Sequence, residues 1–144
     1  HKNLLIVPSK SKSKSEVIQE LGNLLVSKGY VSNAQEFIKD VYLRETEGVT
    51  GIGQGVAIPH GKSLSVKDTT ITVAVLENDI EWETLDEQPV KVVIMFAVKD
   101  TDATTTHILL LQQVAQLLAH DDFLYELGKV KTVDNLYQLL TRSN

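Results

Sequence analysis

The sequence predicts an α/β fold, an α/β/α sandwich in which a mixed central β-sheet is flanked by helices. Two observations predict it. Residues 69–76 and 90–98 are apolar, β-branched runs with the composition of buried strands. On both sides of these runs, apolar residues recur at the spacing of a helix. With 144 residues, 42% of them hydrophobic, the chain is long enough to bury a core, so we expect a single domain over residues 1–144.

A short strand and a helix are expected first. Residues 4–7 form an apolar run that Pro8 closes. Ser13 stands three residues before Glu16, which is the spacing of a capping box and predicts a helix over residues 14–28. The apolar face of this helix consists of Val17, Ile18, Leu21, Leu24 and Leu25.

A second helix is expected to follow. Ser32 stands three residues before Gln35 and repeats the capping signal. The helix is expected to end near Glu45 and to carry Arg44 in its last turn. Its apolar face consists of Phe37, Ile38 and Val41.

A glycine-rich stretch then interrupts the helical pattern. Residues 49–55 hold glycine at alternate positions, namely Gly51, Gly53 and Gly55. Glycine has the largest backbone entropy to lose, so we expect a loop here rather than a strand. Residues 56–58 are apolar and predict a short strand that stops at Pro59. His60 is therefore expected just past a strand end.

The second half of the chain continues with the two buried strands and a long helix. Residues 78–89 form a polar connection between the strands, and Trp82 is expected to anchor it. Residues 104–119 have strong helical periodicity. The residues expected to face inward on this helix are Leu110, Leu111, Val114, Leu117 and Leu118.

Two shorter helices are expected at the end of the chain. Asp121 and Thr132 are the predicted N-caps of these helices, and Gly128 is predicted to end the first one. His120 precedes Asp121 at a helix end, where capping or simple solvent exposure explains it.

Composition excludes several classes of function. The formal net charge is −5 and the basic residues are scattered, which argues against nucleic-acid binding. With no cysteine, the chain has no disulfide, thiolate nucleophile or cysteine zinc site. No apolar run approaches the roughly 18 residues of a membrane helix, and no signal-peptide pattern is present, so we expect a cytoplasmic protein without membrane insertion. Because the chain begins at His1 rather than Met, we expect its N-terminus to be either a cloning remnant over residues 1–2 or a cut from a longer polypeptide.

The glycine-rich stretch does not match the known nucleotide-binding loops. A dinucleotide fingerprint needs G-x-G-x-x-G between a strand and a helix, whereas these glycines precede a strand. Gly55, Gly61 and Lys62 have the wrong spacing for a P-loop. Both nucleotide-binding interpretations are therefore rejected.

His60 is the main candidate for chemistry, although a histidine in such a place is often an ordinary loop residue. Its setting favours a function. The upstream glycines and Gly61 could leave backbone N–H groups free to converge on an anion, as a backbone nest does. A neutral imidazole is a good nucleophile near physiological pH. The pattern is suited to carrying a phosphoryl group.

Two further residues could serve such a site. His107 is predicted in the first turn of a helix, either as a polar residue at the rim of the core or as a neutral hydrogen-bond donor beside an anion. Arg44 could be a helix-terminal cation, or it could hold phosphate oxygens. A metal site formed by His60, His107 and a carboxylate lacks the usual ligand spacing, and we expect none.

Four stretches of the chain resemble one known family. They are residues 43–45 (LRE), 50–62 (TGIGQGVAIPHGK), 85–90 (LDEQPV) and 106–111 (THILLL). Together they resemble the enzyme IIA domains of the bacterial phosphoenolpyruvate-dependent sugar phosphotransferase system, fructose/mannitol class. The resemblance extends from about residue 3 to residue 140. Departures are few: Ile108 replaces a common leucine, and residues 104–106 are all threonine.

This resemblance implies a phosphotransferase component that works through a phosphohistidine intermediate. His60 would accept the phosphoryl group from the phosphocarrier protein HPr and pass it to a cysteine on a IIB domain, either fused to or associated with IIB and IIC parts. His107 would hydrogen-bond the phosphoryl group and Arg44 would help to neutralise it. Backbone donors would come from Gly51, Gly53, Gly55 and Gly61. No cofactor is required. The partners would dock on a shallow apolar patch including Ile52 and Val56.

The alternative function is regulatory. In a nitrogen-type or transcription-regulator-linked module of the same family, phosphorylated His60 would be a signal rather than a transport intermediate. The close match of residues 50–62 and 85–90 favours sugar transport of the fructose type. A third hypothesis, a histidine metallohydrolase, would require bound zinc. In a sugar phosphotransferase system, recognition of the transported sugar would belong to the membrane component.

Overall fold

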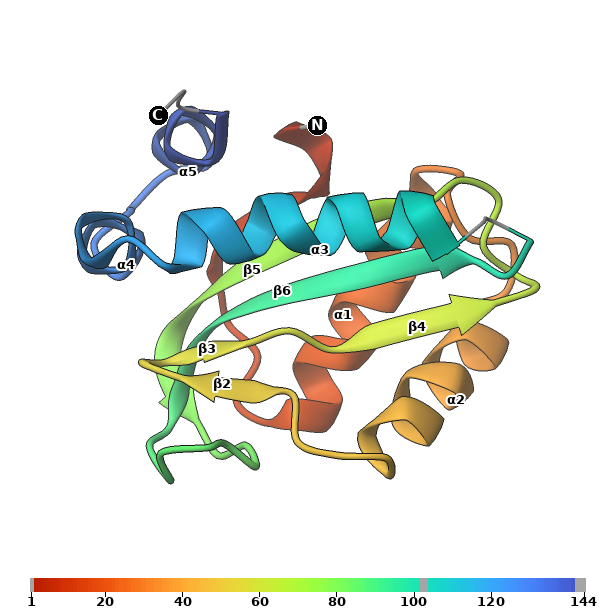
Figure 1. Cartoon of the computed structure of the whole chain (residues 1–144), viewed down its shortest axis with the longest axis horizontal. Coiled ribbons are helices and arrows are strands. Elements are labelled where there is room, and N and C mark those ends of the chain that lie inside the picture. Colours follow the sequence, from red (N-terminus) through yellow and green to blue (C-terminus); the bar gives the residue numbers. More distant parts are fainter. Residues whose placement is uncertain (1, 102–103, 142–144) are drawn as a thin grey trace.

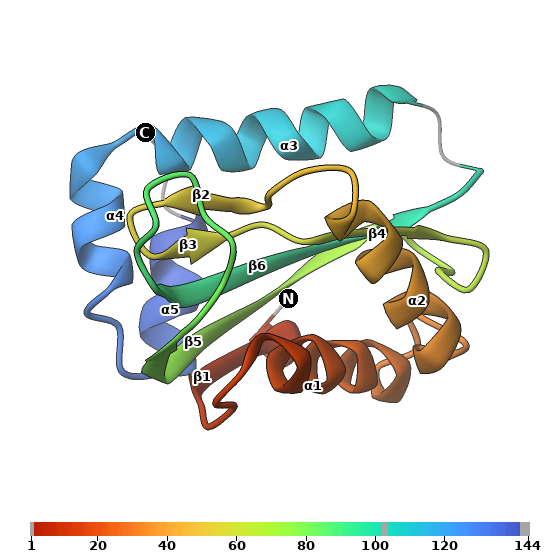
Figure 2. The ribbon, with the colours of Figure 1, turned by 90° about the horizontal axis from the view of Figure 1, so that it is seen from below.

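A computed structural model describes residues 2–101 and 104–141, apart from the side chains of residues 104–108, 110 and 111. Six strands form one mixed sheet, and helices cover both of its faces (Figures 1 and 2). The strands are β1 (Leu5–Ser9), β2 (Gly51–Gly53), β3 (Val56–Ala57), β4 (His60–Ser63), β5 (Thr70–Ile80) and β6 (Val90–Lys99). The helices are η1 (Lys2–Leu4), α1 (Lys14–Ser27), α2 (Ala34–Glu45), α3 (Thr104–Leu118), α4 (Asp121–Leu127) and α5 (Val133–Thr141).

The predicted α/β/α sandwich is confirmed by two separate apolar cores, one on each face of the sheet. Strand β6 shows the division, because its successive side chains point to opposite faces. Val93, Met95 and Ala97 belong to the core that includes α1 and α2. Ile94 and Phe96, from the same strand, belong to the core with α4 and α5. The near-continuous apolar composition of β6 thus reflects burial on both faces.

The strands run in both directions, as expected for a mixed sheet. The strand order is β1-β5-β6-β3-β2, and β4 also pairs with β6. Strands β5 and β6 are antiparallel, whereas β1 is parallel to β5 and both β3 and β4 are parallel to β6. The register places Ala57 opposite Val93 and His60 opposite Phe96, with the same offset in both pairs. Strands β3 and β4 therefore form one interrupted line beside β6.

Pro59 explains the interruption and corrects the expected position of His60. Proline has no N–H to donate to a ladder, but its carbonyl accepts the N–H of Phe96 at 2.9 Å. The chain then resumes pairing at once. His60 follows the end of β3, as expected, but it is the first residue of β4 rather than a loop residue.

The glycine-rich stretch is also partly a strand, which corrects the expectation of a loop. Gly51–Gly53 forms β2 and pairs antiparallel with β3. The two residues between these strands, Gln54 and Gly55, have φ values of 57° and 80°. Positive φ at both positions of a two-residue connection is typical of a type I′ hairpin turn, which suits the twist of the flanking strands. The glycines build a hairpin.

The helix starts are mostly as predicted. Ser13 caps α1 by accepting the N–H of Glu16, and Thr132 accepts the N–H of Asn135 at the start of α5. The predicted cap of α2 is wrong: Asn33 rather than Ser32 occupies the N-cap position and accepts the N–H of Glu36. Ser32 instead donates its N–H to the carbonyl of Ser65 at 2.8 Å.

One further correction concerns the C-terminal half. Asp121 is the first helical residue of α4, and His120 occupies the N-cap position without a side-chain cap. Val114 of α3 is buried as expected and Leu117 and Leu118 are half-buried, whereas Leu110 and Leu111 lie outside the described side chains. Trp82 is buried at 8% exposure, as predicted. Within the ranges the structure describes, no helix combines the length and apolar composition needed to cross a membrane.

Candidate functional site

His60 lies at the start of β4, in the middle of the interrupted line beside β6. Alternate residues of a strand face opposite sides, so His60 points away from Gly61. Its ring packs edge to face against Phe96, with ring centroids 4.6 Å apart and planes inclined at 71°. Its Nδ1 atom is buried. The contact with Phe96 fixes the orientation of a half-buried imidazole on the face of the sheet that carries α4 and α5.

Gly61 is required by packing on the opposite face. A Cβ at this position would overlap the ring of Phe37 and would lie 2.8 Å from Cγ2 of Val41. Both residues are fully buried on α2, which lies beside β4 (Figure 1). Gly61 thus allows α2 to pack directly against the strand that carries His60. The structure gives a packing reason for the residue that we expected to be a backbone donor.

The other glycines expected to form an anion nest have structural partners. The N–H of Gly51 donates to the carbonyl of Glu83 at 3.2 Å, so it is committed to the connection between β5 and β6. The carbonyl of Gly55 accepts the N–H groups of Lys91 and Val92. Gly53 has a φ of 95° and packs against Asp86. These glycines shape the hairpin that leads to His60, and the Gly51 amide does not serve as a free donor.

The hairpin turn is held by a carboxylate from the β5–β6 connection. The Oδ2 atom of Asp86 accepts the N–H of Gln54 at 2.9 Å, and its Oδ1 atom accepts the N–H of Gln88 at 3.1 Å. These bonds, first that from Gln54 and then that from Gln88, lower the pKa of Asp86 below its ordinary value. The sequence motif LDEQPV therefore contributes a clamp on the hairpin.

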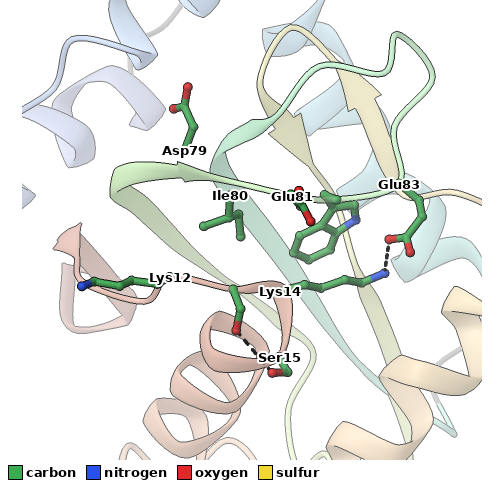
Figure 3. A pocket seen from close by; sticks show the side chains of 9 residues that line it. Lys12, Lys14, Ser15, Asp79, Ile80, Glu81 and Glu83 are labelled. Atoms are coloured by element: carbon green, nitrogen blue, oxygen red, sulfur yellow. Dashed lines mark hydrogen bonds and ion pairs between the residues drawn. The ribbon is translucent and has the colours of Figure 1, made fainter.

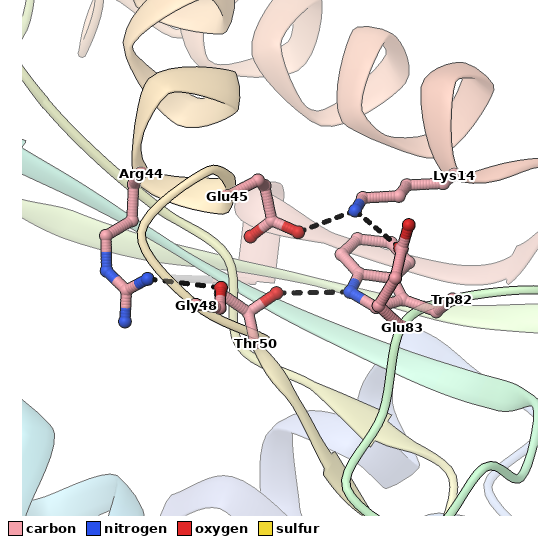
Figure 4. Close-up of polar contacts among 7 residues, drawn as sticks. All are labelled: Lys14, Arg44, Glu45, Gly48, Thr50, Trp82 and Glu83. Carbon is pink, nitrogen blue, oxygen red and sulfur yellow. Dashed lines mark hydrogen bonds and ion pairs between the residues drawn. The ribbon is translucent and has the colours of Figure 1, made fainter.

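Arg44 lies in the last turn of α2, where it was expected. Phe37, Val41 and Arg44 have the i, i+4, i+7 spacing of one helix face, and the first two of them pack at Gly61. Its guanidinium Nη1 donates to the carbonyl of Gly48 at 3.4 Å (Figure 4). Arg44 is half-buried. Its guanidinium points toward the segment that joins α2 to β2.

A cluster of charged and aromatic side chains beside Arg44 was not predicted. The ammonium of Lys14 lies 2.7 Å from Oε1 of Glu45 and 2.8 Å from Oε1 of Glu83, and 4.9 Å from the ring centroid of Trp82. The indole N–H of Trp82 donates to Oγ1 of Thr50 at 3.1 Å (Figure 4). Only the connection 78–89 with its tryptophan signalled this cluster, because its members come from distant parts of the sequence.

The remaining predicted site residues are placed only in part. His107 belongs to α3, but its side chain lies outside the described part of the structure. His120 is exposed at the start of α4. Among the residues that the structure describes, no group of three or more His, Cys, Asp or Glu is arranged to hold a metal ion.

The apolar patch around the hairpin differs from the one predicted. Ile52 is 36% exposed, but Val56 is buried at 2% and is unavailable for contact. Leu85 is 72% exposed, and its N–H donates to the carbonyl of Gly51, so it lies beside β2. Leu43, adjacent to Arg44, is 61% exposed. We call Leu43, Ile52 and Leu85 the apolar rim.

With the geometry established, comparison with known proteins identifies the family. Residues 1–143 match the family described as "Phosphoenolpyruvate-dependent sugar phosphotransferase system, EIIA 2". The chain belongs to this EIIA type-2 family. Domains of this family are phosphoryl carriers that act as phosphotransferase components, and the resemblance seen in the sequence is confirmed.

Relatives of this EIIA type-2 chain include transport and regulatory proteins. It is 33% identical over 141 residues to the PTS system 2-O-alpha-mannosyl-D-glycerate-specific EIIABC component of Escherichia coli, covering 97% of this chain but only 21% of that protein. It is 36% identical to the nitrogen regulatory protein of Escherichia coli, covering 88% of this chain and 75% of the relative. The crystal structure of nitrogen regulatory protein IIA-Ntr from Neisseria meningitidis superposes with a TM-score of 0.88 at 26% identity, covering 98% and 95% of the two chains.

Proposed function

We propose that this chain carries a phosphoryl group on His60, accepting it from phosphorylated HPr and passing it to a cysteine of a IIB domain during sugar uptake. The observation that carries the proposal is the setting of His60 in a family of phosphoryl carriers. Its ring is oriented by Phe96 and its Nδ1 atom is buried, so we assign Nε2 as the accepting nitrogen. The bond between phosphorus and HPr breaks as the P–Nε2 bond forms, and in onward transfer the P–Nε2 bond breaks as a P–S bond to the cysteine forms.

By family resemblance, Arg44 and His107 complete the proposed site. In-line phosphoryl transfer depends on positioning and on stabilising charge rather than on covalent chemistry by the protein. A guanidinium from the end of α2 could neutralise the transferring group by charge-assisted bonds. His107 would donate a hydrogen bond to the phosphoryl oxygens. No metal or cofactor is part of this proposal.

The apolar rim is the proposed docking surface for both protein partners. Leu43, Ile52 and Leu85 are exposed apolar side chains, of which Leu43 lies in the last turn of α2, Ile52 in β2 and Leu85 beside β2. HPr and the IIB domain must use the same histidine in turn, so they compete for this surface. A relay also needs fast release, which favours a small and weak interface.

The choice between transport and regulation rests on the partner. Similarity to an EIIABC component favours transport through IIB and IIC parts, whereas the 36% identity to a nitrogen regulatory protein favours signalling. The fructose-type assignment stays a prediction, because a relative named for a mannosylglycerate is also similar. A cytoplasmic location stays a prediction as well. Onward transfer to an isolated IIB domain would support transport, and failure with every IIB domain of the source organism would support the regulatory function.

The decisive experiment is phosphorylation by phosphoenolpyruvate, enzyme I and HPr, followed by intact mass spectrometry. We expect the wild-type chain to gain one acid-labile phosphoryl group and His60→Ala to gain none. His120→Ala is the matched control, because it removes an exposed histidine at the start of α4 and should be labelled fully. Full labelling of His60→Ala would contradict the proposed site, and no labelling of the wild type would contradict the function.

A further inference from the structure

The strongest unassigned feature is the charged cluster around Lys14. It joins three separate segments: the start of α1, the end of α2 and the connection that follows β5. Lys14 also lines a surface groove of about 650 Å³ together with Trp82 and Glu83, and Figure 3 shows its side chain directed toward Glu83. One ammonium therefore ties together elements that lie far apart in the sequence.

The Lys14–Glu45 pair is more than a surface ion pair. The side chain of Glu45 is only 8% exposed and that of Lys14 is 21% exposed. Among the described residues, Oε2 of Glu45 has no hydrogen-bond partner, so the ammonium of Lys14 provides the compensation for this carboxylate. Removing one member of a buried pair leaves an uncompensated charge, which is costly. Burial alone would lower the pKa of Lys14, but the hydrogen bonds with Glu45 and Glu83 outweigh it and raise the pKa.

The cluster is connected to the proposed site on two sides. Glu45 directly follows Arg44, whose guanidinium donates to Gly48. Thr50, held by the indole of Trp82, accepts the N–H of Ile58 through its own carbonyl at 2.9 Å. Ile58 stands two residues before His60. The cluster thus holds the beginning and the end of the segment from Arg44 to Thr50.

Within that segment, residues 46 and 47 are held to the last turn of α2, because Thr46 donates its N–H to the carbonyls of Tyr42 and Leu43 and Glu47 donates its N–H to that of Arg44. Residues 46–49 are exposed, whereas Glu45 and Thr50 at its ends are anchored by Lys14 and Trp82. Phe37 and Val41 already pack α2 against β4, so the contacts of Lys14 act on the last turn of this helix, where the Arg44 guanidinium must stay aligned with a transferring group. Misplacement of about 1 Å by a distant change can lower a rate by about 100-fold.

We propose that Lys14 is a positioning residue for phosphoryl transfer at His60, which acts by holding Glu45 and Glu83 and so fixing the segment that carries Arg44 and Thr50. This rests on the proposed function of His60. Lys14 itself touches neither the phosphoryl group nor the donor. Its effect belongs to the transfer step rather than to the docking of HPr.

The test uses two phosphoryl donors. Phosphoramidate is a small donor that loses ammonia and needs no docking surface, and phosphorylated HPr is the protein donor. We expect Lys14→Met to lower kcat with both donors by about 10- to 100-fold, with the KM for HPr changed less than about twofold. Lys14→Arg keeps the charge and the reach, and should recover most of the rate.

Lys2→Met is the matched control. Lys2 also makes an ion pair, 3.0 Å from Asp134, and also lies over an aromatic ring, 5.1 Å from the centroid of Tyr137, but it belongs to the α5 side of the molecule. This variant should load at the wild-type rate. Equal rates for Lys14→Met and Lys2→Met would overturn the positioning role.

A second variant separates positioning from stability. Lys14→Met leaves the Glu45 carboxylate uncompensated, and the double variant Lys14→Met/Glu45→Gln removes that charge. We expect the double variant to regain thermal stability while its loading stays slow. Recovery of the rate together with stability would show a merely structural role. A wild-type chain that takes no phosphoryl group from either donor would overturn the proposed function as well, whereas normal loading of both wild type and Lys14→Met would overturn this proposal alone.

Discussion

The carboxylate of Asp86 accepts the backbone N–H of Gln54 at 2.9 Å and thereby joins the β5–β6 connection to the hairpin that precedes His60. The same carboxylate accepts the N–H of Gln88. Because these bonds favour the charged form, the pKa of Asp86 is lower in the folded chain than in the unfolded chain. A carboxyl with a lowered folded pKa stabilises the fold above its unfolded pKa, and this contribution is lost as the pH falls through the folded pKa.

Asp86→Ala should therefore be less stable than the wild type at neutral pH. The difference in unfolding free energy should stay constant down to about pH 4, the ordinary range of an aspartate, and should shrink below it. Urea denaturation at a series of pH values measures this difference. Asp79→Ala, which removes an exposed carboxyl from β5, is the control. A difference that does not change with pH would show that the charge of Asp86 has no part in holding the hairpin.

Gly61→Ala should destabilise the fold, because the added methyl group would force α2 away from β4. Overpacking of this kind typically costs about 1–3 kcal/mol. Gly48→Ala is a matched control, since a Cβ at Gly48 meets nothing within 4 Å. Chemical denaturation of both variants gives the comparison. If Gly61→Ala were as stable as Gly48→Ala, the close approach of Phe37 to the strand would be wrong.

Glu87→Gly should stabilise the protein. Glu87 is exposed and has a φ of 60°, a left-handed conformation that costs most residues about 1–2 kcal/mol and glycine little. Glycine also gives the unfolded chain more backbone entropy, which favours unfolding. We therefore expect a net increase of about 0.5–1 kcal/mol in the free energy of unfolding. The urea midpoint should rise. Glu81→Gly is the control, because Glu81 is exposed and outside the left-handed region, and this substitution should lower the urea midpoint. An equal effect of both substitutions on the midpoint would contradict backbone strain at Glu87.

The sequence predicts best those elements whose signals are local. Ser13 and Glu16 lie within one turn, and they place the start of α1 correctly. The two buried strands, β5 and β6, are predicted from their apolar, β-branched composition alone. The prediction of the α2 cap is wrong because Ser32 and Asn33 are both good N-cap residues. Ser32 instead donates its N–H to the carbonyl of Ser65, which is distant in the sequence.

Pairing between distant residues explains the other differences. A strand made of Gly51–Gly53 forms only because β3 and the connection near Thr84 offer partners on both sides. The register of β3 and β4 against β6 put His60 in a strand, and nothing near His60 in the sequence specifies that register. The Lys14 cluster likewise depends on three remote segments. The sequence motif of residues 50–62 is enough to single out His60. The residues that surround His60 are set by tertiary contacts, which the motif does not contain.

The last prediction separates the roles of Arg44 and His107. Arg44→Ala should slow both loading of His60 from phosphorylated HPr and onward transfer, because a cation that stabilises the transferring group acts in both directions. The loss of one such stabilising group typically lowers a rate by about 100- to 1000-fold. Arg44→Lys keeps the charge without the bidentate geometry, so its rates should be intermediate.

His107→Ala should instead retain loading and impair transfer to the IIB domain. Rapid-quench measurements of the two half-reactions, each with its own partner, give the two rates for every variant, with His120→Ala as the control. The ratio of onward transfer to loading should fall in His107→Ala and stay near the wild-type value in Arg44→Ala. Equal ratios in the two variants would mean that both side chains act on the phosphoryl group in the same way, and the separate role of His107 would have to be abandoned.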